Sequence, residues 1–406
     1  MGLPSGKSPD ARHRNGAGGG DDPLQAGSGQ CPPGQRGPRH RLNPRPRLSH
    51  RLGLYPGLAA TWLLLSPPLQ AESLRLATWN SDFERRGPGL LLRDIASGED
   101  PQIGAALQLL VALQADVLLL SGFDYDHDLM AARAFAGALA LQGLEYPILF
   151  ALRPNRGMQS GLDLDGDGRQ GGPGDAQGFG WFSGQSGMLL LSRYPVQTEA
   201  VQDYSTFLWR DLPGALHPDS LSPEALSLQR LSTTGHWQIP LILPGGVSLT
   251  LLVWHATPPV FDGADDLNGR RNHDETAFWL SLLSGLPGLK SPEPPFVLIG
   301  TPNLDPEDGE GRPDAIRALL THPALQDPEP RAGWSENDAG QRGDPALDTV
   351  RLEGLGGLRL AMILPDRSLK VVASGILRPE PQDPLSRASR LASRHFPVWV
   401  DLQLPE

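Results

Sequence analysis

The chain has 406 residues, of which 39% are apolar and 20% charged, and its 48 glycines and 41 prolines argue against a helical bundle. The formal net charge is −11, and because residues 1–71 are basic, the remainder is more acidic still. An acidic surface repels polyanions, so we expect no avid nonspecific nucleic-acid binding. The single cysteine, Cys31, cannot form an intrachain disulfide.

Residues 1–50 are rich in Gly, Pro, Arg and Ser without apolar periodicity, which predicts a disordered leader or a start site assigned too far upstream. Residues 51–71 follow the pattern of a signal peptide, with a basic start, an apolar centre at 57–65 and Ala71 at a cleavage site. A short buried hydrophobic segment is the alternative. The segment is too short to span a bilayer, so we expect no stable membrane anchor. The signal-peptide interpretation predicts export to the periplasm or the extracellular space.

Residues 72–406 alternate short apolar runs with longer polar or helical stretches, which predicts one α/β domain without an internal repeat. Strands are predicted over 74–79, 116–120, 188–192, 247–255, 296–300, 358–364 and 397–402. Helices are predicted over 104–115 and 272–283. In the second helix, Asn272 is the expected N-cap, with Glu275 completing a capping box.

Seven motifs along this region resemble, in order, those of the endonuclease/exonuclease/phosphatase superfamily, typified by pancreatic deoxyribonuclease. They read LRLATWN, ADVLLLSGFDYD, GMLLLSRYPV, LLVWHATPP, FVLIGTPNLDP, LRLAMILPD and ASRHFPVWVDL. The chain is most similar to a bacterial exported subgroup that carries segments like SGLDLDGDGRQGGPGDAQGFG. The resemblance implies an α/β (α+β) four-layer sandwich of two packed mixed β-sheets flanked by helices, with the site where strand ends converge.

The superfamily cleaves phosphoesters with a divalent metal held by carboxylates, while a histidine steered by a carboxylate handles protons. Four retained positions match that pattern: Asn80, His255, Asn303 and His395. Four acidic positions do not match, because their residues are Gly122, Thr301, Ala361 and Arg394. Gly122 replaces a metal-binding Glu, and Ala361 replaces the Asp that orients the last histidine. The resemblance with these replacements implies that the usual hydrolysis is lost.

The first functional prediction is therefore a non-hydrolytic protein that binds a phosphate-containing small molecule or another anion. Asn80, Arg394, Arg270 and Arg271 are the candidate ligand-binding residues beside the retained histidines. One alternative is an active phosphodiesterase or phosphatase that uses Mg²⁺ or Mn²⁺, with Asp124 as a substitute ligand. Another is a structural or interaction module stabilised by calcium.

The DLDGDG stretch presents Asp163, Asp165 and Asp167 at alternate positions before Gly168, as in the opening of a calcium loop. The closing Glu of such a loop is missing, because Gly174 stands at its position. A structural calcium loop and a hydrated turn are both compatible with this pattern.

Three other groups leave alternatives open. Arg270 and Arg271 either reach a phosphate beside His255 or tie their own loop together with the nearby aspartates. The acidic stretch after Asn303 either binds an ion or forms a solvated loop. His236 is either an ordinary packed histidine or a ligand, and the packed role is the one expected. The acidic residues concerned are Asp262, Asp265, Asp274, Asp305, Glu307 and Asp308.

Overall fold

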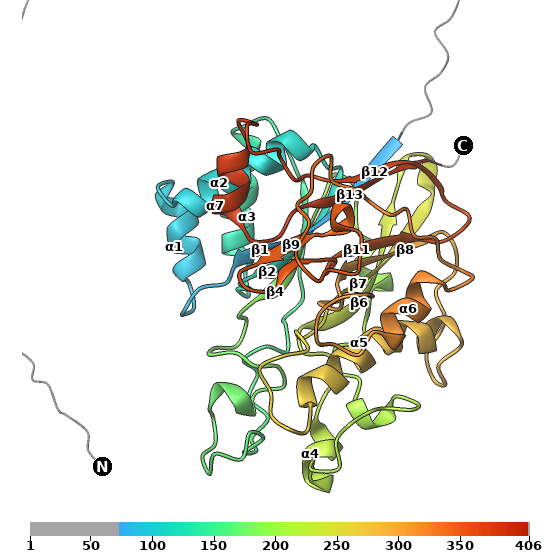
Figure 1. The fold of residues 1–406 in the computed structure, drawn as a ribbon. Helices are drawn as coiled ribbons and strands as arrows, with labels where there is room; N and C mark the ends of the chain where they lie inside the picture. The colour runs from blue at the N-terminus through green and yellow to red at the C-terminus, as the bar shows by residue number, and fades with distance from the viewer. Residues whose placement is uncertain (1–72, 405–406) are drawn as a thin grey trace, which may run out of the picture. The chain divides into compact units, whose positions relative to one another are not determined.

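The computed structural model describes residues 73–404, in which two β-sheets lie face to face with helices outside them (Figure 1). The first sheet has six strands in the order β12-β13-β1-β2-β4-β3, in which only β1 and β2 are parallel. Its strands are β1 (Ser73–Phe83), β2 (Val117–Phe123), β3 (Ile148–Phe150), β4 (Gly187–Ser192), β12 (Lys370–Ile376) and β13 (Val398–Gln403).

The second sheet has five strands in the order β11-β8-β7-β6-β5, in which only β7 and β8 are parallel. Its strands are β5 (Gln202–Asp203), β6 (Gly235–Ile242), β7 (Ser248–His255), β8 (Phe296–Thr301) and β11 (Met362–Pro365). A small antiparallel pair, β9 (Val350–Leu352) and β10 (Gly356–Leu358), lies in the chain between β8 and β11.

Alternating side chains build three apolar layers, because successive residues of a strand point to opposite faces of a sheet. On β1, Leu76 faces the core between the sheets, whereas Ala77 faces the helices. The first outer layer contains α1 (Leu90–Ser97), α2 (Pro101–Leu113), α3 (Met130–Ala140) and α7 (Ser386–Ala392). The second contains α5 (Leu267–Leu283) and α6 (Asp314–Leu320). A short helix, α4 (Pro223–Leu228), follows β5. The predicted four-layer sandwich is confirmed.

Two predicted elements are wrong in detail. The strand predicted over 358–364 is split, because Thr349 Oγ1 accepts hydrogen bonds from the backbone N–H groups of Leu360 and Ala361. Those two residues therefore lie in the connection between β10 and β11 and do not pair with a neighbouring strand. The helix predicted to start at Asn272 begins at Leu267, and Asn272 is buried within it.

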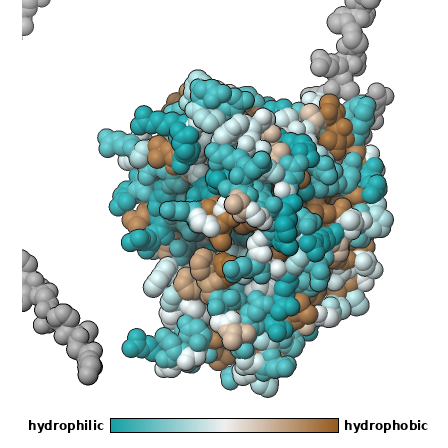
Figure 2. Space-filling view, viewed as in Figure 1, coloured by the Kyte–Doolittle hydropathy of each residue, from teal (hydrophilic) through white to brown (hydrophobic). Residues whose placement is uncertain are grey.

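The leader and signal peptide predicted over 1–50 and 51–71 lie outside the described residues. Within residues 73–404, no helix is long and apolar enough to cross a membrane. Hydrophilic side chains cover most of the face seen in Figure 2, and apolar ones gather there in small groups.

Candidate functional site

The candidate site lies where the two parallel strand pairs end together. Asn80 of β1 is in register with Ser121 of β2, and His255 of β7 is in register with Thr301 of β8. The hydroxyl groups of Ser121 and Thr301 are 2.8 Å apart and buried, so one hydrogen bond joins the two sheets at this edge. Where the resemblance implies an Asp, the Thr301 side chain is thus engaged between the sheets.

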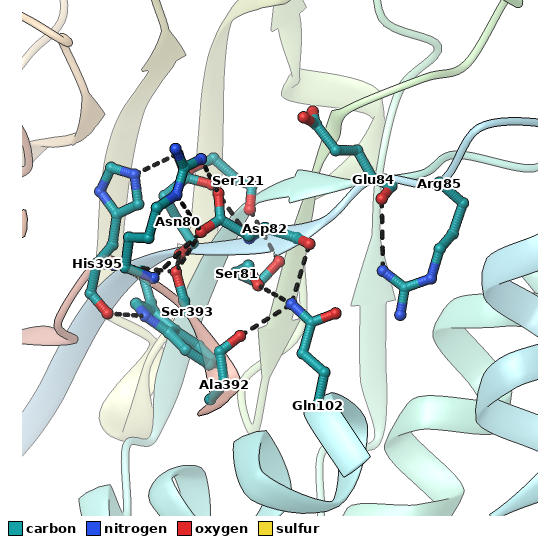
Figure 3. Close-up of polar contacts among 12 residues, drawn as sticks. Asn80, Ser81, Asp82, Glu84, Arg85, Gln102, Ser121, Ala392, Ser393 and His395 are labelled. Carbon is teal, nitrogen blue, oxygen red and sulfur yellow. Dashed lines mark hydrogen bonds and ion pairs between the residues drawn. The ribbon is translucent and has the colours of Figure 1, made fainter. Parts of the chain in front are cut away.

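The loop before β13 brings His395 to the end of β1 (Figure 3). Asn80 Nδ2 lies 3.3 Å from His395 Nε2. Two further bonds fix this histidine: Trp79 Nε1 donates to His395 O at 2.9 Å, and His395 N donates to Ser393 Oγ at 3.0 Å. Ser393 Oγ donates in turn to Asn80 O at 2.8 Å. The predicted neighbours Asn80 and His395 therefore form one hydrogen-bonded unit.

Asp82, a residue that the sequence analysis missed, holds Arg394. Arg394 Nη2 lies 3.0 Å from Asp82 Oδ1, and the Asp82 backbone is left-handed, with φ at 52°. Burial acts to raise the pKa of Asp82, but Arg394 and His395 together hold it below its usual range. The positive charge of Arg394 is therefore paired, and Asp82 offsets part of the repulsion that a cation would meet.

Gly122 leaves no room for a side chain. Its φ is +70°, and a Cβ at this position would overlap Asn80 Oδ1. The amide of Asn80 thus occupies the space through which a glutamate at position 122 would leave the backbone. A side chain at position 122 would therefore require the Asn80 amide to move and would hold the backbone in a left-handed conformation.

Both site histidines are buried, and neither has a steering carboxylate among the described residues. His255 is 3% exposed and His395 is 6% exposed. Nδ1 of each finds no hydrogen-bond partner among the described residues, and Ala361 supplies no carboxylate to His395. Burial lowers the pKa of His395 to about 4 and that of His255 well below its usual value. Both rings are therefore neutral at pH 7.

Asn272 and Glu275 support the site from α5, which corrects the capping box predicted for them. Asn272 Nδ2 donates to the carbonyls of Thr257 and Pro302, at 2.6 and 2.8 Å, so it joins the loops that follow β7 and β8. Glu275 accepts bonds from Thr233 N and Oγ1 and from Thr257 N, at 2.6 to 2.7 Å. The spacing that resembles a cap instead points both side chains into the protein.

Asn303, a predicted site residue, also holds a loop. Its backbone is left-handed, with φ at 52°, and its Nδ2 donates to Ala256 O at 2.8 Å. The side chain is 8% exposed. Asn303 therefore lies at the same edge as His255, the residue before Ala256.

Arg270 and Arg271 are engaged elsewhere, which corrects the prediction that they bind a ligand. Arg271 is 5% exposed and donates only to backbone carbonyls among the described residues, those of Gln177, Arg230, Leu231 and Ser232. Arg270 donates to the carbonyls of Asp265 and Leu216. The alternative, in which both arginines tie loops together, fits these contacts, although the bonds run to carbonyls and not to carboxylates.

Asp124 does not replace the missing glutamate. Its two carboxylate oxygens accept hydrogen bonds from Ser186 N and Arg85 N, at 2.9 and 2.8 Å. Burial raises its pKa to about 6. Asp305 is used in the same way, since its oxygens accept bonds from the N–H groups of Glu307, Asp308 and Arg359. Asp124 therefore joins its loop to the segments at Arg85 and Ser186, and Asp305 holds its own loop and the backbone at Arg359.

Asp163, Asp165 and Asp175 form the one group of metal-ligand type within residues 73–404, with ligand atoms within 4.8 Å of one another. Asp175 takes the place predicted for Asp167, because the loop closes back so that Asp175 Oδ1 accepts from Leu164 N at 2.8 Å. At the strand ends no comparable group exists in the described part of the chain. Asp82 does lie there, but Arg394 engages both of its oxygens, through Nη2 at Oδ1 and through the backbone N–H at Oδ2. The residues at this edge therefore do not fit the metal of the superfamily.

The fold is a deoxyribonuclease-I-like α/β sandwich. It has two mixed sheets face to face, helices outside them, and a polar site where the strand ends converge. The model of the Endonuclease/Exonuclease/phosphatase family matches residues 77–395, and the chain belongs to this family. A search of curated proteins finds no match.

Solved structures that are similar to this chain are distant in sequence. An endonuclease/exonuclease/phosphatase from Beutenbergia cavernae is 18% identical, with a TM-score of 0.48, and the match covers 82% of this chain and 72% of that one. Sphingomyelinase C from Streptomyces griseocarneus is 16% identical, with a TM-score of 0.42 and coverages of 81% and 99%. A mannosyl-6-phosphatase from Bacteroides thetaiotaomicron is 13% identical, with a TM-score of 0.42 and coverages of 82% and 100%.

Because the site histidines are neutral in the folded protein, we expect the protein to lose stability in acid. The pKa of His395 is about 4 in the folded protein, whereas an unfolded histidine titrates near about 6.5. Between these values the unfolded chain binds the additional proton. The free energy of unfolding should therefore fall as pH drops from about 6.5 to 4, by up to about 1.4 kcal/mol per pH unit for this residue.

Urea denaturation at pH 7 and pH 5 checks this for the wild type and His395→Gln. The free energy of unfolding should differ less between pH 7 and pH 5 in the variant than in the wild type. Asp124 and Asp348 act in the opposite direction, since burial raises their pKa values to about 6. The comparison with the variant isolates the contribution of His395. If both proteins lose the same free energy of unfolding between pH 7 and pH 5, the low pKa of His395 is contradicted.

Proposed function

We propose that this family member binds a phosphate group or a similar anion without hydrolysing it. The observation that carries the proposal is the contact at Gly122, where Asn80 fills the space that a metal-binding glutamate would need. We further propose that the protein is exported, which rests on the sequence of residues 51–71. The mass of the chain recovered from the periplasm or medium tests export, and a chain retaining residues 51–71 would contradict it.

Hydrogen-bond donors without metal ligands support an anion site. Asn80, His255 and His395 bring an amide and two imidazoles together at the strand ends, and Arg394 and Asn303 lie at the same edge. Burial keeps both imidazole rings neutral, and their Nδ1 atoms have no partner among the described residues. A bound anion would therefore accept hydrogen bonds from neutral N–H groups of these rings. Such donors bind an oxyanion, but they do not activate a water molecule as a carboxylate-steered histidine does.

We expect no hydrolysis above background. The full chain and its His395→Ala variant would be assayed on a phosphodiester and a phosphomonoester with Mg²⁺, Mn²⁺ or Ca²⁺. Equal rates are expected for the two proteins, together with heat released on titration with inorganic phosphate in the presence of a chelator. Metal-dependent turnover that disappears in the variant would favour the alternative, an active phosphodiesterase or phosphatase.

A second candidate role is a structural calcium site at Asp163, Asp165 and Asp175, since oxygen ligands at this spacing suit a large cation. Calcium should raise the melting temperature of the wild type and leave that of Asp163→Ala unchanged. Asp167→Ala is the matched control, because Asp167 lies outside the group, and it should respond as the wild type does. A wild-type melting temperature that calcium does not move would remove this role.

A further inference from the structure

Arg156 reaches the candidate site from the loop between β3 and β4. Its Nε donates to Thr234 Oγ1 at 3.2 Å. Thr234 precedes Gly235, which is in register with His255 across the β6–β7 pair. The backbone is anchored as well, because Gly184 N donates to Arg156 O at 3.3 Å. The guanidinium is therefore held beside the end of β7. Its charge acts there, since burial first and Arg156 second lower the pKa of His255.

The guanidinium of Arg156 makes few contacts with the other described residues. Within the described part of the chain its side chain makes the single bond from Nε and no ion pair, and Glu84 and Glu275 act on it only at longer range. Neighbouring arginines differ, because Arg271 is saturated by carbonyls and Arg394 is paired with Asp82. A half-buried cation with free N–H groups carries a desolvation cost that a bound oxyanion would offset.

We propose that Arg156 binds the phosphate group directly, through its two terminal nitrogens, beside His255 and Asn80. This inference rests on the proposed function, and it adds the residue that supplies the charge. A planar guanidinium presents paired N–H donors that match two oxygens of a tetrahedral oxyanion, so the ligand class is a phosphate or a phosphate monoester. A fixed cation at this place provides positive charge without any metal ion.

Calorimetric titration of the full chain with inorganic phosphate, in the presence of a chelator, tests the assignment. Arg156→Gln should weaken binding about tenfold or more, the usual effect of losing a charge-assisted contact. Arg153→Gln is the matched control, because Arg153 lies three positions earlier in the same loop and donates to Ser183 Oγ. It removes the same charge and should leave the affinity within about twofold, as expected for a screened surface charge.

The outcomes distinguish a failure of the proposed function from a failure of the role assigned to Arg156. A wild type that does not bind phosphate contradicts the proposed function, and the role of Arg156 falls with it. A wild type and an Arg156→Gln variant of equal affinity overturn only the role of Arg156. Because Arg156 has no carboxylate partner within residues 73–404, its replacement should keep or raise the melting temperature, and a lower value would mark a structural role instead. If the glutamine variant does not fold, Arg156→Lys replaces it in the titration, and an affinity equal to that of the wild type would overturn the paired contact.

Discussion

Replacing Glu275 by glutamine lowers the free energy of unfolding by about 3–5 kcal/mol, the usual cost of removing one partner from a buried set of charges. The carboxylate is fully buried and accepts bonds from Thr233 and Thr257, and its charge balances that of Arg271. A glutamine would turn an NH₂ group toward backbone donors and leave Arg271 without a counter-charge. Urea denaturation at pH 7 measures the change.

Glu310→Gln is the control for this variant, because Glu310 is exposed in the loop before α6. It should change the free energy of unfolding by no more than about 0.5 kcal/mol, as surface substitutions usually do. A loss below about 1 kcal/mol for Glu275→Gln would show that the network around Thr233 and Thr257 rearranges, contrary to the rigid support described above.

Replacing Gly122 by alanine lowers the free energy of unfolding by about 2–3 kcal/mol. The left-handed backbone alone costs a residue with a Cβ about 1–2 kcal/mol, and the new methyl group would also meet Asn80 Oδ1. Gly98→Ala separates the two costs, because Gly98 has φ at +67° and open space around its Cβ position. Gly98→Ala should therefore lose about 1–2 kcal/mol only.

The double variant Asn80→Ala/Gly122→Ala tests the contact itself. If Asn80 causes the additional loss, the double variant should be more stable than the sum of the single effects predicts. Additive losses would show that the methyl group does not press on the Asn80 amide. Gly122→Glu should not produce magnesium-dependent hydrolysis, which the phosphodiester assay measures directly.

Local patterns predicted β1, β2, β4, β7, β8 and β13, because buried strands require apolar runs that the sequence displays openly, but they missed β6 and β12 of the same two sheets. A short apolar run located the strand that carries Leu76 and Ala77, whose side chains face opposite sides of the sheet. The same local reasoning failed at Asn272, where a spacing of three residues suits a helix cap and an inward-facing pair equally well. Only the packing of α5 on the loops after β7 and β8 distinguishes the two arrangements.

Long-range pairs of the site were beyond prediction from local patterns. Asp82 and Arg394 are 312 positions apart, and nothing near either residue indicates the other. Arg156 stands in an irregular loop without a periodic pattern, and its position depends on bonds to Thr234 and Gly184. Asp175 joins Asp163 only because the intervening loop folds back. The retained positions were found by resemblance, but their partners depend on the fold.

The contact between Gly122 and Asn80 also bears on any attempt to rebuild a metal ligand at this strand end. A side chain placed at position 122 meets the Asn80 amide and has to adopt a left-handed backbone. Moving the Asn80 amide would relieve the contact but would leave that backbone conformation unchanged. A carboxylate at this strand end therefore requires the main chain to change as well as the side chains.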